Sequence, residues 1–387
     1  MKYVNDFGID QSIDIVNSSD IDFSQKIFDS IKNDYSEFNE WAEKIKIERR
    51  PVIKASIKNE IIGIAILKEE DMMEFTDSPL KKNVRLKICT FKIVQDHAYL
   101  GELFIKKIVD YALERRIFEL YLTVLEKNDI LIDFLKRYGF QVDSVLKNER
   151  YQRSEYVVVK KIIPSEDEIE LESYDFNTRY YPSILVTNCN IFLVPSTPTY
   201  HDAFFVDNSN QSHFGELNDF SCRKQHLIEK KYYTKSKNNK IRRGDILIFC
   251  RSGNNQRITS IGVVTMVTHT NLYSREARTI STSLKIPNNG RSKKDISDDY
   301  KLEITFRHCL NLKKPIDLKR MNIIYSRSIG RDSEFNIPQS LHPVNLLYLK
   351  FVIYLGGIMP NCVYMRSGDG YICMPPPSKL LMEDLSD

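Results

Sequence analysis

The spacing of apolar residues changes twice between residues 84 and 113. Residues 84–94 are rich in β-branched and aromatic side chains, which predicts a strand. The residues QDHA at 95–98 interrupt this run. From Gly101 onward, apolar residues recur every three or four positions, as they do on one face of a helix. A strand, a loop and an amphipathic helix are therefore predicted in this order.

A second strand and a second helix follow. Residues 119–124 form an apolar run of strand length, and Asn128 and Asp129 are residue types that cap helices. The apolar face of the next helix leads to a stop at Gly139. In such a strand–helix–strand–helix unit, the start of the first helix collects backbone amides and the positive end of the helix dipole. The residues alone thus indicate a site suited to phosphate near Gly101.

Four stretches of this unit resemble a known family. They are residues 86–92 (LKICTFK), 100–103 (LGEL), 120–124 (LYLTV) and 138–140 (YGF). Their order and spacing resemble the acyl-CoA-binding core of the GNAT superfamily of N-acetyltransferases. The resemblance implies an α+β fold with a mixed sheet flanked by helices, in which the first core strand splays from the second. It also implies that this strand holds the thioester of acetyl-CoA, the acyl donor, and that amides of the following loop hold its pyrophosphate.

The resemblance also implies site residues. Those expected to bind the cofactor are Phe91, Ile93, His97, Ala98, Tyr99, Leu100, Gly101, Glu102 and Asn128. The family's loop pattern falls on Asp96, Tyr99 and Gly101, and only Gly101 agrees with it. Where many members carry a tyrosine as general acid, this chain has Leu135. The catalytic hydroxyl is therefore predicted to be that of Tyr138, with Tyr121, Thr123 and Tyr99 as further candidates.

The remainder of the first half fits the same fold. Residues 22–47 have helical spacing, and residues 51–56 and 60–67 predict a hairpin that turns at Lys58 and Asn59. Residues 151–160 predict a further strand. An acidic stretch, which comprises Glu69, Glu70, Asp71 and Glu74, is interpreted as a solvated loop, with a repulsive or cation-binding edge as the alternative. Cys89 could act as a nucleophile, but the family transfers the acyl group directly, and a strand cysteine is usually a small hydrophobic residue.

Charge divides the chain into three parts. Residues 1–163 carry 27 Lys and Arg against 28 Asp and Glu, a net charge of −1. Residues 164–175 carry none against six, and residues 176–387 carry 29 against 18, a net charge of +11. This distribution predicts a GNAT domain over residues 1–163, an acidic linker over 164–175 and a basic domain with a C-terminal tail over 176–387. A polyanion is the first partner to consider for a basic domain.

The basic domain is predicted to be mostly β. The expected elements are a hairpin of residues 183–186 and 190–194, a helix-like stretch at 227–233, strands at 246–250, 258–267 and 302–306, a helix at 274–284, and a helix or strand at 344–355. A turn at Gly244 and Asp245, a strand, a polar turn and the sequence IGVV at 261–264 resemble the PUA-like superfamily, which includes ASCH and EVE domains. The resemblance implies a small barrel of a kind that often binds RNA or modified bases. The signature stretch of ASCH domains is not visible, which leaves the subfamily open.

Basic and aromatic residues interleave in this domain, as they would on a surface that follows a nucleic-acid strand. The residues expected to bind nucleic acid are Lys230, Lys231, Tyr232, Tyr233, Arg242, Arg243 and Arg251. Ordinary solvated turns explain the same pattern equally well.

Composition narrows the class of protein. The seven cysteines are odd in number and show no paired spacing, which argues against a disulfide framework and against a zinc site, and no metal is expected. No run of eighteen apolar residues exists, and residues 1–30 carry Asp and Asn where a signal peptide needs an apolar segment. A soluble, cytoplasmic protein without a membrane partner is therefore expected.

Three functions follow from the sequence. The first is an acyl-CoA-dependent N-acetyltransferase whose PUA-like domain presents an RNA, of which tRNA is one candidate. The second is an N-acetyltransferase that acts on a protein or a small amine, with a regulatory second domain. The third is a non-catalytic nucleic-acid-binding protein with a degenerate GNAT domain. The sequence names neither the acceptor nor the oligomeric state, and it leaves a toxin or defence role open.

Overall fold

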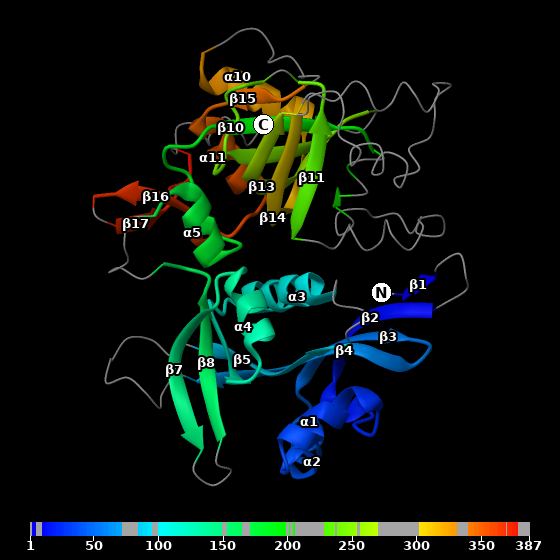
Figure 1. The fold of residues 1–387 in the computed structure, drawn as a ribbon. Helices are drawn as coiled ribbons and strands as arrows, with labels where there is room; N and C mark the ends of the chain where they lie inside the picture. The colour runs from blue at the N-terminus through cyan, green and yellow to red at the C-terminus, as the bar shows by residue number, and fades with distance from the viewer. Residues whose placement is uncertain are drawn as a thin grey trace. The chain divides into compact units, whose positions relative to one another are not determined.

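The structure is a computed structural model of the 387-residue chain. It describes residues 2–4, 10–71, 84–94, 100–148, 153–164, 171–198, 201, 204–205, 228–236, 238–253, 256–269, 302–330, 340–368 and 370–377. These residues form two compact units, one up to Ile162 and one from Ile163 onward (Figure 1).

The first unit is built on an eight-stranded mixed sheet. In sheet order its strands are β1 (Lys2–Val4), β2 (Asp10–Asn17), β3 (Pro51–Ile57), β4 (Glu60–Asp71), β5 (Val84–Ile93), β6 (Glu119–Leu125), β8 (Arg153–Lys161) and β7 (Gln141–Asn148). β5 and β6 run parallel, and the other neighbouring strands run antiparallel. This is the mixed α/β architecture that the GNAT resemblance implies.

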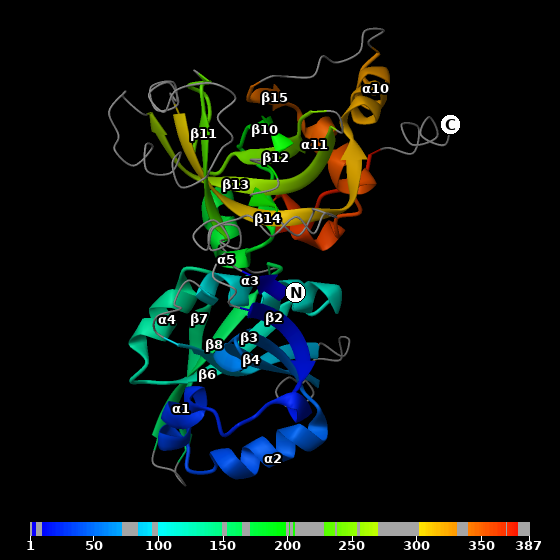
Figure 2. The ribbon, with the colours of Figure 1, turned by 90° about the vertical axis from the view of Figure 1, so that its right-hand side faces the viewer.

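Helices cover both faces of this sheet (Figures 1 and 2). One face carries the 3₁₀ turns η1 (Ser18–Asp20) and η2 (Lys26–Phe28) and the helices α1 (Asp29–Asp34) and α2 (Phe38–Glu48), and the other carries α3 (Leu100–Glu114) and α4 (Asp129–Lys136). Phe28, Phe38 and Ile45 pack with Val52 and Ile64 in one buried cluster. The inner face of α2 is therefore apolar, because it packs against β3 and β4. The predicted strands and helices of residues 84–140 are all confirmed.

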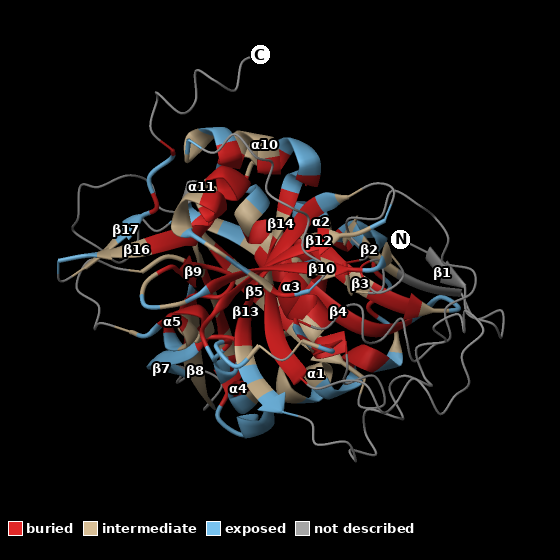
Figure 3. Cartoon of the chain, turned by 90° about the horizontal axis from the view of Figure 1, so that it is seen from above, coloured by how far each residue is buried: buried red, intermediate tan, exposed pale blue. Residues whose placement is uncertain are grey.

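Two features of this unit differ from the prediction. β4 continues to Asp71, so Glu69, Glu70 and Asp71 lie on a strand and not in a solvated loop. The prediction was wrong because pairing with β5 extends β4 beyond its apolar part. β7 was not predicted, since its side chains from Gln141 to Lys147 are all exposed and it lacks the alternation of a half-buried strand (Figure 3). The β3–β4 hairpin turns at Lys58 and Asn59, both with positive φ, as predicted.

The second unit contains a six-stranded sheet and a three-stranded sheet. The larger sheet consists, in sheet order, of β11 (Glu229–Thr234), β14 (Leu302–Asp317), β13 (Arg257–His269), β12 (Ile246–Arg251), β10 (Ile191–Ser196) and β15 (His342–Val344). The smaller sheet consists of β17 (Gly370–Cys373), β16 (Val363–Ser367) and β9 (Ile184–Leu185). The helical elements are α5 (Ser173–Tyr180), α10 (Leu318–Ser328), α11 (Leu346–Leu355) and the 3₁₀ turn η7 (Pro360–Cys362).

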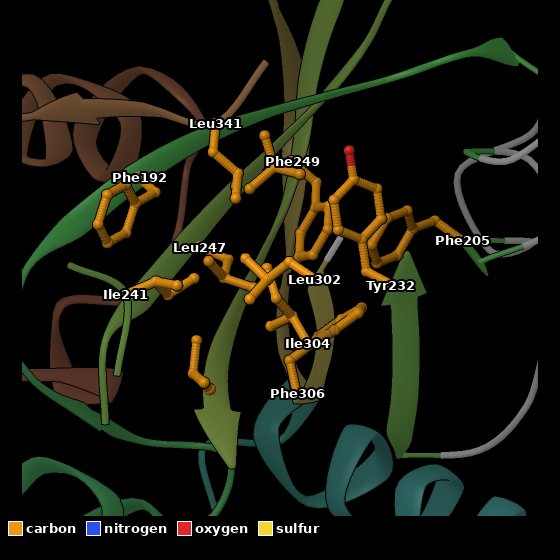
Figure 4. Close-up of a cluster of buried hydrophobic side chains, with 12 residues drawn as sticks. Phe192, Phe205, Tyr232, Ile241, Leu247, Phe249, Leu302, Ile304, Phe306 and Leu341 are labelled. Atoms are coloured by element: carbon orange, nitrogen blue, oxygen red, sulfur yellow. The ribbon is translucent and has the colours of Figure 1, made fainter. Parts of the chain in front are cut away.

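The larger sheet is strongly curled around one apolar cluster (Figure 4). β11 lies at one edge and β10 near the other, yet the Tyr232 hydroxyl on β11 donates to the Pro195 carbonyl on β10 at 3.2 Å. Phe249 and Phe306 fill the inside, with ring centroids 4.6 Å apart. No pairing among the described strands closes the sheet, so the PUA-like barrel stays a prediction.

The structure contradicts two local predictions in this unit and decides a third. Residues 183–186 and 190–194 do not form a hairpin, because β9 pairs with β16 and β10 pairs with β12. The helix-like stretch is a strand from Glu229 onward, because pairing with β14 along its whole length outweighs the local pattern. Most of the ambiguous stretch from 344 to 355 forms α11 (Leu346–Leu355), whose first turn is capped by the Asn345 side chain, while Val344 ends β15. The helix predicted at 274–284 lies outside the described residues.

No helix in the described ranges is both long enough and apolar enough to cross a membrane.

Candidate functional site

The two central strands of the first unit separate from each other. β5 and β6 are paired at only two positions, where Leu86 faces Leu120 and Lys87 faces Tyr121. Beyond Lys87 the described residues of these strands form no further pairs with each other, although β4 and β8 stay paired with their outer sides. The strands therefore open as a V, with its vertex at Lys87 and Tyr121. The GNAT resemblance implies this splay.

A bulge in β5 lies next to the point where the strands diverge. Ile88 faces Leu67 on β4 and Thr90 faces Ile66, so Cys89 is an extra residue without a partner. A bulge bends its strand and increases the local twist. It lies two residues after the last pair with β6, at the position where β5 and β6 separate. The backbone N–H and C=O groups on the open side of β5 then have no strand partner among the described residues.

The start of α3 is packed tightly against α4. Leu100 and Gly101 are buried in the first turn, and Glu102 is half-buried. A Cβ on Gly101 would lie 2.7 Å from Cζ of Phe134 on α4, which is closer than real contacts allow. A side chain at this position would therefore require the Phe134 ring to shift. His97, Ala98 and Tyr99 lie outside the described residues.

Aromatic side chains join β5, α3 and α4 beside the V. The Phe91 ring lies 6.2 Å from the Phe104 ring and 6.3 Å from the Phe134 ring. The Phe134 ring is in turn 5.2 Å from that of Tyr138, which is buried at the end of α4. We call Phe91, Phe104, Phe134 and Tyr138 the aromatic cluster. It brings Tyr138, the first candidate acid, close to the β5 residues expected to hold the thioester.

A polar group of residues surrounds the vertex of the V. The Tyr121 hydroxyl donates to one Glu70 carboxylate oxygen, and Lys68 Nζ lies 2.6 Å from the other. Lys87 Nζ lies 5.5 Å from the centre of the Tyr121 ring. We call Lys68, Glu70, Lys87 and Tyr121 the vertex network. It combines β4, β5 and β6 at the point where the strands part.

The vertex network sets the protonation of its members. Burial acts to raise the pKa of Glu70, but hydrogen bonds from Lys68 and Tyr121 outweigh it, so the pKa is lowered and the carboxylate stays ionised. Burial, followed by the hydrogen bond to Glu70, raises the pKa of Tyr121. The Tyr121 proton is therefore firmly held and is shared with a carboxylate.

The candidate hydroxyls lie on opposite faces of the sheet. Glu69 accepts from Tyr111 on α3 at 3.1 Å, so its neighbour Glu70 points to the face away from α3. Tyr121, which binds Glu70, lies on that face, and by alternation Thr123 does too. Tyr138 lies on the face covered by α3 and α4. The structure therefore groups Tyr121 with Thr123 and separates both from Tyr138.

Two further predicted residues lie at the ends of their elements. Ile93 is the last residue of β5, half-buried and opposite Gly63 on β4. Asn128 is exposed at the N-terminus of α4, where its carbonyl accepts from the Leu131 and Ile132 amides while its side chain makes no capping bond. Both lie beyond the vertex, toward the open end of the V.

Cys89 is not set up as a nucleophile. The Arg50 guanidinium donates to its sulfur at 3.3 Å, and Arg50 also pairs with Glu48 at 2.6 Å. Burial raises the pKa of the Cys89 thiol, and the charge of Arg50 offsets this only in part. A thiol that stays protonated is a poor nucleophile.

The reasoning from sequence missed Lys68 and Glu70. Both lie in a charged stretch that was interpreted as a loop. The available signal was the two-residue alternation of β4, which places Lys68 and Glu70 on one face, opposite Lys87 and Arg85 on β5.

The second unit divides the predicted nucleic-acid-binding residues into two groups. Tyr232, Tyr233 and Lys230 are buried, and a buried ring has no open face on which a base could stack. This corrects the interpretation of residues 230–233 as a continuous binding surface, because both tyrosines are buried and Tyr232 packs in the apolar cluster inside the sheet. Lys231 is exposed but pairs with Glu303 at 2.9 Å, and Arg251 is half-buried at the end of β12.

Arg242 and Arg243 form the exposed group. The Arg242 guanidinium donates to the Asn188 carbonyl at 2.8 Å. The Arg243 guanidinium lies 3.5 Å from the centre of the Tyr174 ring on α5, and Arg307 approaches the same ring at 5.7 Å. Asp175 is 3.8 Å from Arg243. An exposed arginine is thus held flat on an aromatic ring.

No protein-family model and no curated protein matches the chain. Among solved structures, Arabidopsis thaliana NAA60 in complex with acetyl-CoA is 18% identical over 39% of this chain and 98% of that one, with a TM-score of 0.31. A ribosomal-protein-alanine N-acetyltransferase from Brucella melitensis is 16% identical over 39% of this chain and 99% of that one, with a TM-score of 0.30. A probable acetyltransferase from Staphylococcus epidermidis is 14% identical over 39% and 98%, with a TM-score of 0.31.

Proposed function

We propose that the first unit is an N-acetyltransferase that uses acetyl-CoA as acyl donor. The observation that supports this most is the V between β5 and β6, with only two paired positions followed by an open strand edge. A linear thioester with amide groups can pair with such an edge as a strand would. The N-terminus of α3 follows β5 in the chain and offers amides and a positive dipole end to a pyrophosphate.

The residues present fit this ligand, and those with different roles lie on the two faces of the sheet. Acetyl-CoA supplies an activated acyl group when it is bound. Backbone N–H groups on the open side of β5 would stabilise negative charge on the carbonyl oxygen. Tyr138, in the aromatic cluster, would donate a proton to the departing sulfur. Tyr121 is committed to Glu70 and serves as a positioning residue at the vertex.

Calorimetry and turnover of the full chain test this proposal. We expect acetyl-CoA to bind to the chain. We also expect CoA to be released when an acceptor is added from a panel of small amines and of peptides with free N-termini. Gly101→Glu places volume and negative charge at the start of α3, so we expect acetyl-CoA affinity to fall by about tenfold or more, a change of about 1.4 kcal/mol or more.

A double variant separates the effect of the charge on ligand binding from its effect on packing, because Gly101 also lies against Phe134. Gly101→Ala combined with Phe134→Ala removes the close contact and adds no charge, and it should bind acetyl-CoA more tightly than Gly101→Glu. Thermal unfolding confirms that each variant folds. Unchanged acetyl-CoA binding by Gly101→Glu, or no binding by the natural chain, would contradict the proposal.

We further propose that the second unit is a PUA-like domain that presents an RNA, of which tRNA is one candidate. Support comes from Arg242 and Arg243, which are exposed, and from the stacking of Arg243 on Tyr174. Cations neutralise phosphates, and an arginine on an aromatic ring can stack with a base.

Fluorescence anisotropy with a labelled tRNA and a duplex DNA of similar length tests this second proposal. We expect tighter binding of the tRNA, affinity that falls with salt, and a loss in the Arg242→Glu, Arg243→Glu double variant. Lys319→Glu with Arg320→Glu on α10 is the matched control. No binding at low salt, or binding without salt dependence, would favour a protein or small-amine acceptor and a regulatory second unit.

A further inference from the structure

β7 presents an open strand edge in the first unit. Among the described strands it pairs only with β8, at the end of the sheet. Its side chains from Gln141 to Lys147 are exposed, and three of them are apolar: Val142 is 41% exposed, Val145 45% and Leu146 52% (Figure 3). Proline, the residue that most simply blocks an edge, is missing from this strand. Such an edge can accept another strand.

The charges on β7 are arranged symmetrically. Asp143 and Lys147 lie two residues on either side of Val145, and neither forms an ion pair within the described part of the chain. Asp143 is also the bulged residue that has no partner on β8. When two copies of one strand pair antiparallel about a two-fold axis, residues equidistant from the axis face each other. With the axis at Val145, each Asp143 would face Lys147 of the other copy.

We propose that two copies of this chain associate through β7, paired antiparallel with Val145 at the two-fold axis. The pairing satisfies the open backbone edge, forms two identical ion pairs and covers Val145 on both copies. The charge pattern selects a second copy, because a different partner would not need a self-complementary sequence. One strand from each copy covers less than the roughly 1,600 Å² of a standard interface, so the dimer should dissociate on dilution.

Charge reversal tests the pairing and its register in the full chain. Sedimentation over a concentration range should show a dimer whose dissociation constant rises by about tenfold or more in Asp143→Lys and in Lys147→Asp, because each change creates two like-charge pairs. The double variant should regain the dimer. An equimolar mixture of the two single variants should also associate, since one strand then carries lysine at both positions and the other carries aspartate at both.

The mixture shows that both single variants are folded. Glu40→Lys on α2, which changes an exposed charge equally, should leave the dimer unchanged. Val145→Cys should give a disulfide-linked dimer above the background of the natural chain, and Ile47→Cys, exposed on α2, should not. A chain that stays monomeric at every concentration, or a dimer whose dissociation constant does not change in the charge variants, would overturn the proposal.

Discussion

The two units each contain a central pair of parallel strands, and the two pairs differ in one respect. In the second unit, β10 and β12 are paired at six successive positions, from Ile191 opposite Ile246 to Ser196 opposite Arg251. In the first unit, β5 and β6 are paired at two. β10 and β12 are buried over most of their length, whereas β5 is half-exposed over much of its length. A complete pair builds a core, and an incomplete one leaves backbone groups without a strand partner among the described residues.

The bulge at Cys89 lies next to the position where the β5–β6 pairing ends. The β10–β12 ladder runs without a shift in register, so both strands keep the same twist. β5 acquires an extra residue against β4 and bends. Four predictions test how far this comparison holds.

The largest expected effect is on the complete pair. Phe249→Ala on β12 removes a fully buried ring that touches Phe306 and Phe205, so we expect a loss of about 3–5 kcal/mol in the free energy of unfolding of the second unit. Phe91→Ala on β5 is the matched change at the open pair and should cost about 1–2 kcal/mol, because that ring is half-buried. Urea denaturation measures both. Equal losses would remove the contrast between the two pairs.

The next effect is on turnover at the open pair. Tyr138→Phe keeps the ring in the aromatic cluster and removes only the hydroxyl, so we expect kcat to fall by about 100-fold where chemistry limits the rate. Tyr111→Phe on α3, which removes a hydroxyl bound to Glu69, is the control and should keep its kcat. Full turnover by Tyr138→Phe would assign the proton donor elsewhere.

A smaller effect concerns the stability of the vertex. Tyr121→Phe removes the hydrogen bond to Glu70 and should cost about 1 kcal/mol at neutral pH, since the carboxylate is partly exposed. The pKa of Glu70 is lowered from 4.5, so its contribution to stability is present above that pH and is lost as the pH falls through the folded-state pKa.

The difference in stability between Tyr121→Phe and the natural chain should therefore shrink on acidification below about pH 4.5. Thermal unfolding at a series of pH values measures it. A difference that does not change with pH would mean that the hydroxyl does not stabilise an ionised Glu70.

The smallest effect is expected at the bulge itself. Cys89→Ala removes a half-buried thiol whose pKa is raised by burial, and we expect a cost of about 1 kcal/mol or less, with turnover within about twofold of the natural chain. Release of CoA in the presence of amine measures the turnover. A large loss of turnover would point to a covalent acyl-cysteine and not to direct transfer.

The sequence by itself determined the elements with strong periodicity. β5, α3, β6 and α4 follow from apolar spacing, and the β3–β4 hairpin follows from two short apolar runs joined at Lys58 and Asn59. Each of these signals lies within one element or one turn. The resemblance of this segment to GNAT proteins implied the splay, and the candidate residues Phe91, Gly101 and Tyr138 were named from it.

Only the tertiary structure decided which residues meet. The bulge at Cys89 exists relative to β4, and the contact between Gly101 and Phe134 joins two helices. Tyr232 turned inward because β11 pairs with β14, although its local pattern suggested a helix. Periodicity within a segment specifies the faces of that segment, whereas register depends on a partner strand far away in the chain. For this reason the sequence indicated the strands of the site, and their pairing decided that they form a V.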